Sequence, residues 1–209
     1  MHEARVLLER GLAELRQPLP GDAGERLLAY VELLAKWNRA FNLTAIRDPV
    51  QMISLHILDS LAVRPHLPSG SLADVGSGAG LPGIPLAIAD PTRPVTLNDA
   101  NQKKASFLRQ ATIELGLRNV QVHLGRAESW QPPTPFACVI ARGYAELARL
   151  VADTRHLLEP DGVIAAMKGV MPKDEMAKLP AGVDCSDVRR LEVPQLDAER
   201  HLVLCRCSA

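Results

Sequence analysis

The chain has 209 residues and carries 24 Lys and Arg against 24 Asp and Glu, so its formal net charge is zero. This balance excludes a protein that holds nucleic acid by a polybasic tail, and a hydrophobic fraction of 47% excludes a disordered chain. The length allows one domain of about 150 residues with a smaller extension. Only two Trp, two Tyr and three Phe occur, so we expect an aliphatic core and no broad base-stacking surface.

Helical periodicity dominates the first part of the chain. Apolar residues recur at helical spacing over 3–16 and 22–38, and Asp48 followed by Pro49 is typical of the start of a third helix that continues through Leu61. We therefore predict an N-terminal helical arm over residues 1–66, followed by a second domain over residues 67–209.

Strand-like and helical patterns alternate in the second domain. Helical patterns such as 101–115 and 144–158 separate short apolar runs at 71–75, 95–98, 120–124, 136–141 and 163–167. This alternation predicts an α/β fold, a parallel sheet with helices on both faces. Only a short loop separates the last two runs, 188–193 and 201–207, which favours a C-terminal antiparallel hairpin.

The cysteines and the apolar stretches bear on the cellular compartment. Cys138, Cys185, Cys205 and Cys207 show neither a CxxC pair nor the spacing of metal ligands, so we expect reduced, mostly buried thiols. No stretch reaches the roughly 18 to 20 apolar residues of a membrane span, and residues 1–10 lack the apolar core of a signal peptide. The sequence predicts a cytoplasmic chain with no membrane contact and no metal.

A glycine-rich turn follows the first strand-like run, with glycines at positions 76, 78, 80 and 83. A backbone that approaches a ligand closely and turns sharply into a helix needs residues without side chains. The spacing of Gly78, Gly80 and Gly83 also fits the dinucleotide fingerprint, and Asp99 lies near the offset expected for a ribose-binding carboxylate. The turn alone is therefore compatible with NAD and with S-adenosylmethionine.

Three features favour S-adenosylmethionine over NAD. Asp74, two residues before the first glycine, is placed to meet the positively charged amino-acid part of that ligand. Pro82 and Pro85 stiffen the start of the helix, which is a poor arrangement for presenting free amides to a pyrophosphate. Glu128, after the third strand-like run, suits a hydrogen bond from an adenine amino group as well as a helix N-terminus. We therefore predict cofactor contacts from Asp74, Gly78, Asp99 and Glu128.

Short motifs spread over the arm and the strands match one protein family. They are KWN at 36–38, FNLT at 41–44, HILDS at 56–60, the stretch 74–85, FLRQ at 107–110, MKG at 167–169 and ERHL at 199–202. On these motifs the chain resembles the bacterial 16S ribosomal RNA guanine-N7 methyltransferases, the glucose-inhibited division protein B family. The resemblance implies a class I S-adenosylmethionine-dependent methyltransferase fold, with a Rossmann-like, seven-stranded, mostly parallel sheet.

The resemblance also implies an activity and a set of contacts. The donor is S-adenosylmethionine, and the acceptor is a guanine in the 530 loop of 16S ribosomal RNA, free or in the 30S subunit. The family's cofactor contacts correspond here to Gly76, Leu81, Ala127, Glu128 and Arg142. No obligate protein partner is evident.

Guanine N7 has an available lone pair and no proton to lose, so its attack on a sulfonium methyl needs no general base. We assign no catalytic acid or base, and expect in-line positioning to supply most of the catalysis, on the order of 7 to 11 kcal/mol. Two other functions are compatible with the glycine-rich turn. One is an NAD-linked oxidoreductase, and the other is a non-catalytic module that binds the cofactor or docks on the ribosome.

Several charged residues are candidates for contacts with the RNA. Arg142 follows the fourth strand-like run and is a candidate for RNA phosphate, for guanine or for the cofactor carboxylate, the alternative being an ion pair at the sheet edge. Lys168 and Arg109 are further phosphate candidates. His56 and Asp59 lie one helical turn apart; without additional ligands they favour a hydrogen-bonded seam between arm and sheet over a metal site.

Overall fold

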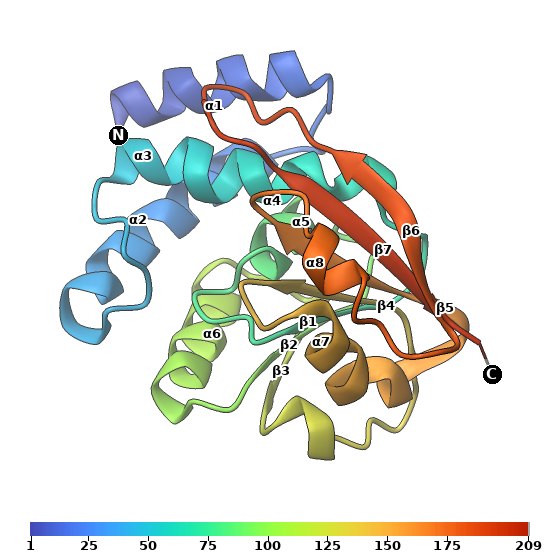
Figure 1. Ribbon diagram of the computed structural model, residues 1–209. Helices are drawn as coiled ribbons and strands as arrows, with labels where there is room; N and C mark the ends of the chain where they lie inside the picture. Colours follow the sequence, from blue (N-terminus) through green and yellow to red (C-terminus); the bar gives the residue numbers. More distant parts are fainter. Residues whose placement is uncertain (209) are drawn as a thin grey trace.

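The computed structural model describes residues 1–208, and its centre is one seven-stranded sheet (Figure 1). The strands are β1 (Leu72–Val75), β2 (Val95–Asp99), β3 (Val120–Leu124), β4 (Phe136–Arg142), β5 (Leu158–Lys168), β6 (Val183–Arg190) and β7 (His201–Cys207). Their order is β3-β2-β1-β4-β5-β7-β6, with β1 to β5 parallel and β7 antiparallel to both of its neighbours. The predicted α/β sheet with a C-terminal antiparallel hairpin is confirmed.

Burial explains why the central strands appear as continuous apolar runs. All four residues of β1 are buried, as are the first six of β4, because helices cover both faces of the sheet there. The edge is less regular: β6 covers Val183–Arg190 and not the predicted 188–193. Its pairing with β7 sets its limits and contains a register shift between Asp184 and Asp187, which hydrophobic alternation does not reveal.

The helices predicted for the first 66 residues are present, separated by loops at 16–22 and 42–48. These are α1 (His2–Leu15), α2 (Ala23–Phe41), and a run of α3 (Pro49–Met52), the π-helical η1 (Ile53–Leu58), α4 (Asp59–Ala62) and the 3-10 helix η2 (Arg64–His66). The side chain of Asp48 accepts a hydrogen bond from the Val50 amide at 2.9 Å, which confirms the predicted helix start.

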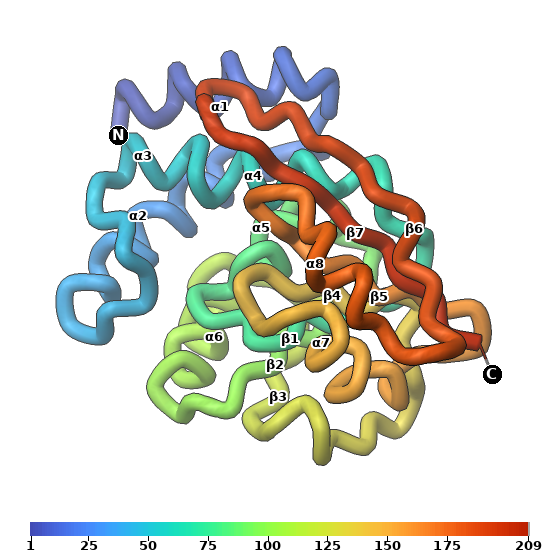
Figure 2. Tube along the Cα trace, in the orientation of Figure 1, coloured from blue at the N-terminus to red at the C-terminus, as the bar shows by residue number. Residues whose placement is uncertain are grey.

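The helical arm shares its core with the sheet. Leu8, Leu27 and Leu61 belong to the same buried apolar cluster as Leu97 of β2 and Phe107. The loop between β6 and β7 also lies beside α1 (Figure 2), where the Gln195 side-chain amide donates to the Leu7 carbonyl at 2.9 Å. The arm is thus held on one side of the sheet by the chain's last segments, while a domain boundary at residue 66 stays a prediction.

The remaining helices cover the two faces of the sheet. Helices α5 (Gly83–Ala89) and α6 (Gln102–Glu114) pack on the arm side, whereas α7 (Leu147–Thr154) packs on the other side with its own apolar cluster. The sequence did not predict the short α8 (Lys173–Met176). Two further 3-10 turns are η3 (Ala127–Ser129) and η4 (Arg155–Leu157). Among the helices of residues 1–208, none is both long and apolar enough to cross a bilayer.

The expectation that all four cysteines are reduced is wrong for Cys185 and Cys205. Their sulfurs form a disulfide bond between β6 and β7. The two residues are 20 positions apart, and antiparallel pairing brings them side by side at the register shift of β6. Spacing along the chain does not carry cross-strand register, so the pair could not be inferred from it. Cys138 is free and buried, and Cys207 is free and half-buried.

Candidate functional site

The glycine turn lies at the carboxyl end of β1, where ligands of open α/β sheets bind. Gly76, Gly78 and Gly80 have φ values of +64°, +60° and +87°, a region that residues with a side chain rarely adopt. The Ser77 amide donates to the Asn98 carbonyl of β2 at 2.9 Å, which ties the turn to the neighbouring strand. The predicted turn is therefore a rigid, side-chain-poor edge of the sheet.

Asp74 stabilises the glycine turn by hydrogen bonds. Its buried Oδ2 accepts hydrogen bonds from Ser77 Oγ at 2.6 Å and from the Gly83 amide at 2.8 Å. A Cβ at Gly83 would approach this oxygen to 2.7 Å, so glycine is needed there. Oδ1 has no hydrogen-bond partner within residues 1–208, and burial raises the pKa of Asp74 to about 6. Asp74 thus connects the two ends of the turn.

Asp99 joins the turn to the start of α6. Its Oδ2 accepts from the Gly78 amide at 2.9 Å, and its Oδ1 accepts from the Asn101 amide at 2.8 Å. The Lys104 ammonium lies 4.0 Å from Oδ2. A carboxylate has about four acceptor positions, so Asp99 retains acceptor capacity toward the cavity that it lines.

A cavity of about 280 Å³, called here the glycine-turn cavity, is bounded by Gly76, Asp99, Ala127, Glu128 and Tyr144. The Tyr144 ring lies so close to Gly76 that a Cβ at position 76 would be 2.7 Å from its Cδ2 atom. The Glu128 carboxylate is partly exposed, 3.4 Å from Arg126 Nη1. The structure thus brings four of the predicted cofactor residues to one cavity.

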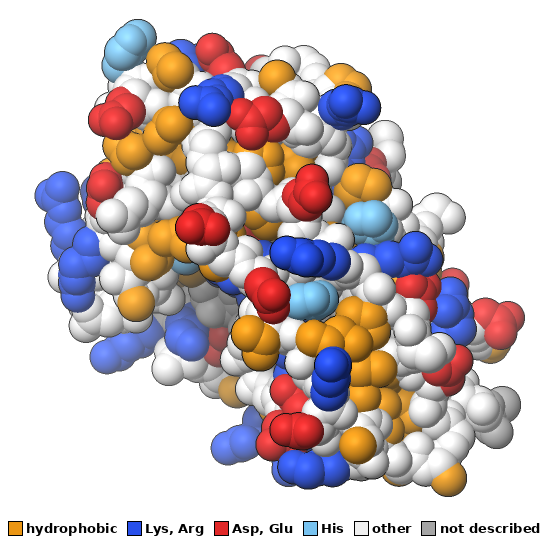
Figure 3. All heavy atoms as spheres, turned by 45° about the horizontal axis from the view of Figure 1, so that its top comes forward, with side chains coloured by type: hydrophobic (Ala, Val, Ile, Leu, Met, Phe, Trp, Pro, Cys, Tyr) orange, Lys and Arg blue, Asp and Glu red, His pale blue; other side chains and the backbone are white. Residues whose placement is uncertain are grey.

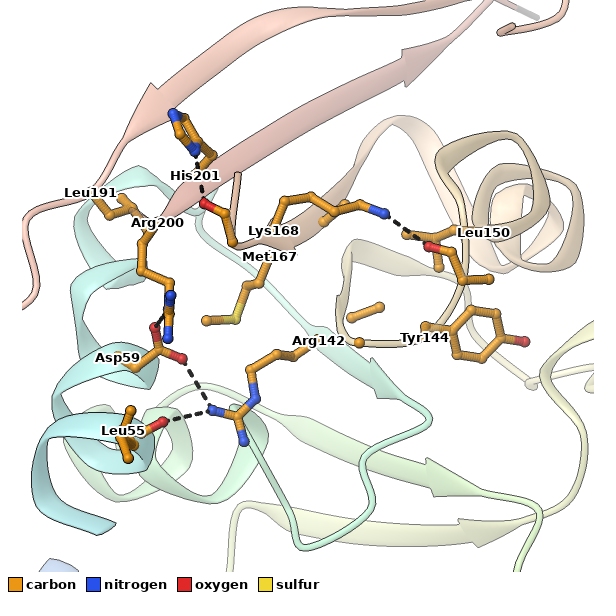
Figure 4. Close-up of a pocket in the computed structure, with 15 residues that line it drawn as sticks. Leu55, Asp59, Arg142, Tyr144, Leu150, Met167, Lys168, Leu191, Arg200 and His201 are labelled. Carbon is orange, nitrogen blue, oxygen red and sulfur yellow. Dashed lines mark hydrogen bonds and ion pairs between the residues drawn. The ribbon is translucent and has the colours of Figure 1, made fainter. Parts of the chain in front are cut away.

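A second cavity of about 380 Å³, called here the arginine cavity, lies at the ends of β4, β5 and β7 (Figure 4). It is lined by Asp59, Arg142, Lys168 and Arg200 among others, and Gly143 and Tyr144 line both cavities. The two cavities are therefore neighbours that meet at the turn after β4.

Asp59 connects the helical arm to the arginine cavity. Its Oδ2 accepts from Arg142 Nη1 at 3.0 Å, and its Oδ1 accepts from Arg200 Nε at 2.9 Å. The imidazole of His56 lies 2.8 Å from Thr44 Oγ1, and burial lowers the pKa of His56 to about 4, so it is neutral at pH 7. The predicted seam between arm and sheet is present at Asp59, whereas the hydrogen bonds of His56, to Thr44 and to the Leu55 carbonyl, stay within the arm.

Lys168 also lines the arginine cavity, with its charge already paired. Its ammonium donates to Glu175 Oε2 at 2.7 Å and to the Ala145 carbonyl at 2.9 Å. The same Glu175 oxygen accepts from the Leu147 amide at 2.7 Å, at the start of α7. Lys168 thereby fixes the loop between β4 and α7.

The other predicted residues lie outside the two cavities as the structure describes them. Leu81 is buried in the hydrophobic core, and Arg109 is exposed on α6. Asp74 and Gly78 act on the glycine turn through their hydrogen bonds.

Sequence reasoning missed Tyr144, Glu175 and Arg200 as site residues. Of these three, only Arg200 could have been found from the sequence, because it lies in the motif at 199–202.

Charges elsewhere on the surface are mixed. Acidic and basic side chains are interspersed over the face shown in Figure 3, in keeping with a net charge of zero. A positive site on this molecule is thus a local feature and not the result of bulk charge.

Solved methyltransferases share this fold. A SAM-dependent methyltransferase from Thiobacillus denitrificans, in complex with S-adenosyl-L-homocysteine, aligns with a TM-score of 0.53 at 13% identity, over 84% of this chain and 97% of that chain. A SAM-dependent methyltransferase from Aquifex aeolicus aligns with a TM-score of 0.55 at 17% identity, over the same shares. The fold is that of the S-adenosylmethionine-dependent methyltransferases.

Sequence comparison identifies the family. The GidB model, described as rRNA small subunit methyltransferase G, matches residues 23–203. The ribosomal RNA small subunit methyltransferase G of Methylobacillus flagellatus is 55% identical over 94% of this chain and 95% of that protein. The protein of the same name from Chromobacterium violaceum is 52% identical over 94% of each. The chain belongs to the GidB family of rRNA small subunit methyltransferases.

Proposed function

We propose that this protein transfers a methyl group from S-adenosylmethionine to N7 of a guanine in the 530 loop of 16S ribosomal RNA. The observation that carries the proposal is the pair of neighbouring cavities that meet at Gly143 and Tyr144, because a methyl donor and an acceptor base must touch. Membership of the GidB family supplies the reaction and the class of substrate.

The glycine-turn cavity fits the donor. Gly76 leaves room for the Tyr144 ring, which packs on it in the wall of the cavity. Asp99 has acceptor capacity for ribose hydroxyls, and Glu128 offers an acceptor to an adenine amino group. When bound, S-adenosylmethionine supplies a methyl group on a positively charged sulfur. The cofactor residues in our proposal are Asp74, Gly76, Gly78, Leu81, Asp99, Ala127, Glu128 and Arg142.

The arginine cavity is our site for the acceptor guanine. Arg142 and Lys168 line it and are RNA candidates, while Arg109 is exposed on α6 and would meet RNA outside it. N7 carries no proton, so the surrounding side chains need only hold the base in line with the methyl group and keep water out. We therefore assign no general base.

Labelled methyl transfer tests the proposal. Purified protein is incubated with tritiated S-adenosylmethionine and unmodified small-subunit RNA, either naked or in the 30S particle, and the labelled nucleoside is identified. We expect 7-methylguanosine at one position. Label on an exocyclic amine or a ribose hydroxyl, or no label with either substrate, would contradict the proposal. The comparison of naked RNA with the particle identifies the preferred substrate.

The same proposal locates the protein. Its substrate is ribosomal RNA, so we place the chain in the cytoplasm, acting without an obligate protein partner.

A further inference from the structure

Three charged residues from distant parts of the chain meet in the wall of the arginine cavity. Asp59 comes from α4 of the arm, Arg142 ends β4, and Arg200 directly precedes β7. One carboxylate accepts from both guanidinium groups, at 3.0 Å and 2.9 Å, and Figure 4 shows both side chains directed at Asp59. The Asp59 side chain is only 3% exposed, so this contact is shielded from solvent.

Both arginines keep N–H groups that their contacts with residues 1–208 do not use. Arg142 donates through Nη1 alone, to Asp59 and to the Leu55 carbonyl at 3.2 Å. Arg200 donates through Nε to Asp59 and through Nη1 to the Glu199 carbonyl at 2.7 Å. A guanidinium has about five N–H donors in a planar fork, and these side chains remain 24% and 23% exposed. Each arginine can therefore bind a further anion.

The charge balance of the cavity suits a single phosphodiester. The charged lining residues Asp59, Arg142, Lys168 and Arg200 include three cations and one anion. Glu175, outside the described lining, neutralises Lys168, and Asp59 neutralises one of the two arginines. The remaining charge of about +1 matches one backbone phosphate, for which paired guanidinium groups are well suited. A larger positive charge would oppose the methylation step, because guanine becomes cationic when N7 is methylated.

We propose that Asp59 is a positioning residue for the RNA, which holds Arg142 and Arg200 together as one clamp on a phosphodiester next to the acceptor guanine. This inference rests on the proposed function. Asp59 itself does not touch the RNA, since both of its oxygens face arginines. The Leu55 carbonyl, on the same helical run, fixes Arg142 from a second direction. The arm thereby helps to set the geometry of the RNA site.

The test compares Asp59→Asn and Asp59→Glu with Asp90→Asn. The control removes the carboxylate of another arginine pair, Asp90 and Arg93, at the end of α5. For each variant we would measure the affinity for small-subunit RNA, the KM for RNA, the salt dependence of RNA binding, and the affinity for S-adenosylhomocysteine by calorimetry.

For Asp59→Asn we expect RNA affinity to fall about tenfold or more, as is typical when one partner of a buried charge pair is removed. The magnitude of the slope of log affinity against log salt should fall by about one, because one phosphate contact is lost. Affinity for S-adenosylhomocysteine should fall by less than the affinity for RNA, because only Arg142 of the two arginines is also among the proposed cofactor residues. Asp59→Glu should restore part of the RNA affinity, and the control should behave as wild type.

Simple charge removal predicts the opposite result. Asp59→Asn makes the cluster more positive, so RNA would bind more tightly if Asp59 served only to offset charge. Tighter binding, or unchanged binding with an unchanged salt slope, would overturn the proposal. If wild type labels N7 while Asp59→Asn binds RNA normally, the inference fails and the proposed function stands. If wild type labels no guanine N7, the proposed function itself fails.

A second variant covers the case in which Asp59→Asn does not fold. Arg200→Lys keeps the charge and loses the planar fork. We expect weaker RNA binding with an unchanged affinity for S-adenosylhomocysteine, and wild-type RNA affinity in this variant would also overturn the clamp.

Discussion

The contact between Gly76 and Tyr144 gives a sharp test of the glycine-turn cavity. In Gly76→Ala the new Cβ would lie 2.7 Å from Tyr144 Cδ2, whereas an ordinary contact begins at 3.4 Å, so the ring must withdraw by about 0.7 Å or more. The Tyr144 hydroxyl donates to Asp153 Oδ2 at 3.1 Å, which resists this movement. Breaking that hydrogen bond costs about 1 kcal/mol, and further strain adds to it. A loss of about 1.4 kcal/mol corresponds to tenfold in binding.

Backbone strain must be separated from the effect of the ring. Gly76 has a φ of +64°, and forcing alanine into this region costs about 1 to 2 kcal/mol. Gly116 has a φ of +62°, and a Cβ added there would meet no atom within 4 Å, so Gly116→Ala carries the same strain without the contact. Urea unfolding should show a loss of about 1 to 2 kcal/mol for Gly116→Ala, and about 1 kcal/mol or more beyond that for Gly76→Ala, where the Tyr144 ring must also move.

Binding of S-adenosylhomocysteine, measured by calorimetry, should then distinguish the two variants. We expect about tenfold weaker binding or more for Gly76→Ala and no change for Gly116→Ala. Adding Tyr144→Ala to Gly76→Ala removes the clash and should recover part of the lost affinity. If Gly76→Ala binds the ligand as tightly as Gly116→Ala does, Gly76 and Tyr144 do not form a wall of the cofactor site and the reasoning is refuted.

Three further predictions concern stability, each measured by urea unfolding. Burial raises the pKa of Asp74 to about 6, so the folded state favours the protonated carboxyl. As pH rises from about 4 to above 6, the unfolding free energy of wild type should therefore fall by about 3 kcal/mol relative to that of Asp74→Asn. Parallel pH profiles of the two proteins would contradict this. Tyr30→Phe removes the buried 2.6 Å hydrogen bond to the Ala79 carbonyl, and should cost about 1 to 2 kcal/mol. Phe107→Ala in the core should cost about 3 to 5 kcal/mol, whereas Ile113→Ala, at a side chain 74% exposed on the same helix, should change stability by less than about 0.5 kcal/mol; equal losses for both would argue against the described packing of α6.

Local signals predicted most of the elements of this fold. The first helix, the strand Val120–Leu124 and the strand His201–Cys207 lie within one residue of their predicted limits, because periodicity reports burial on one face of a continuous segment. The edge strand β6 was misplaced by several residues, since its limits depend on pairing with β7. The predicted helix at 144–158 is regular only over Leu147–Thr154.

The candidate site was predictable in part for the same reason. Asp99 and Glu128 follow strands of a parallel sheet, so their meeting at one edge follows from topology. Asp74 was expected beside the ligand, and in the structure its carboxylate binds Ser77 and Gly83 within the turn. Hydrogen bonds of this kind depend on how the turn folds, which the motif does not specify.

The sequence by itself determined the class of fold, the position of the glycine turn and the family, because each depends on residues that are close together in the chain. Tertiary structure alone decided the strand order, the Cys185–Cys205 bond and the cluster around Asp59. Asp59 meets arginines 83 and 141 positions away. Contacts over such distances arise only when the arm packs against the end of the sheet, so no pattern within a short window records them.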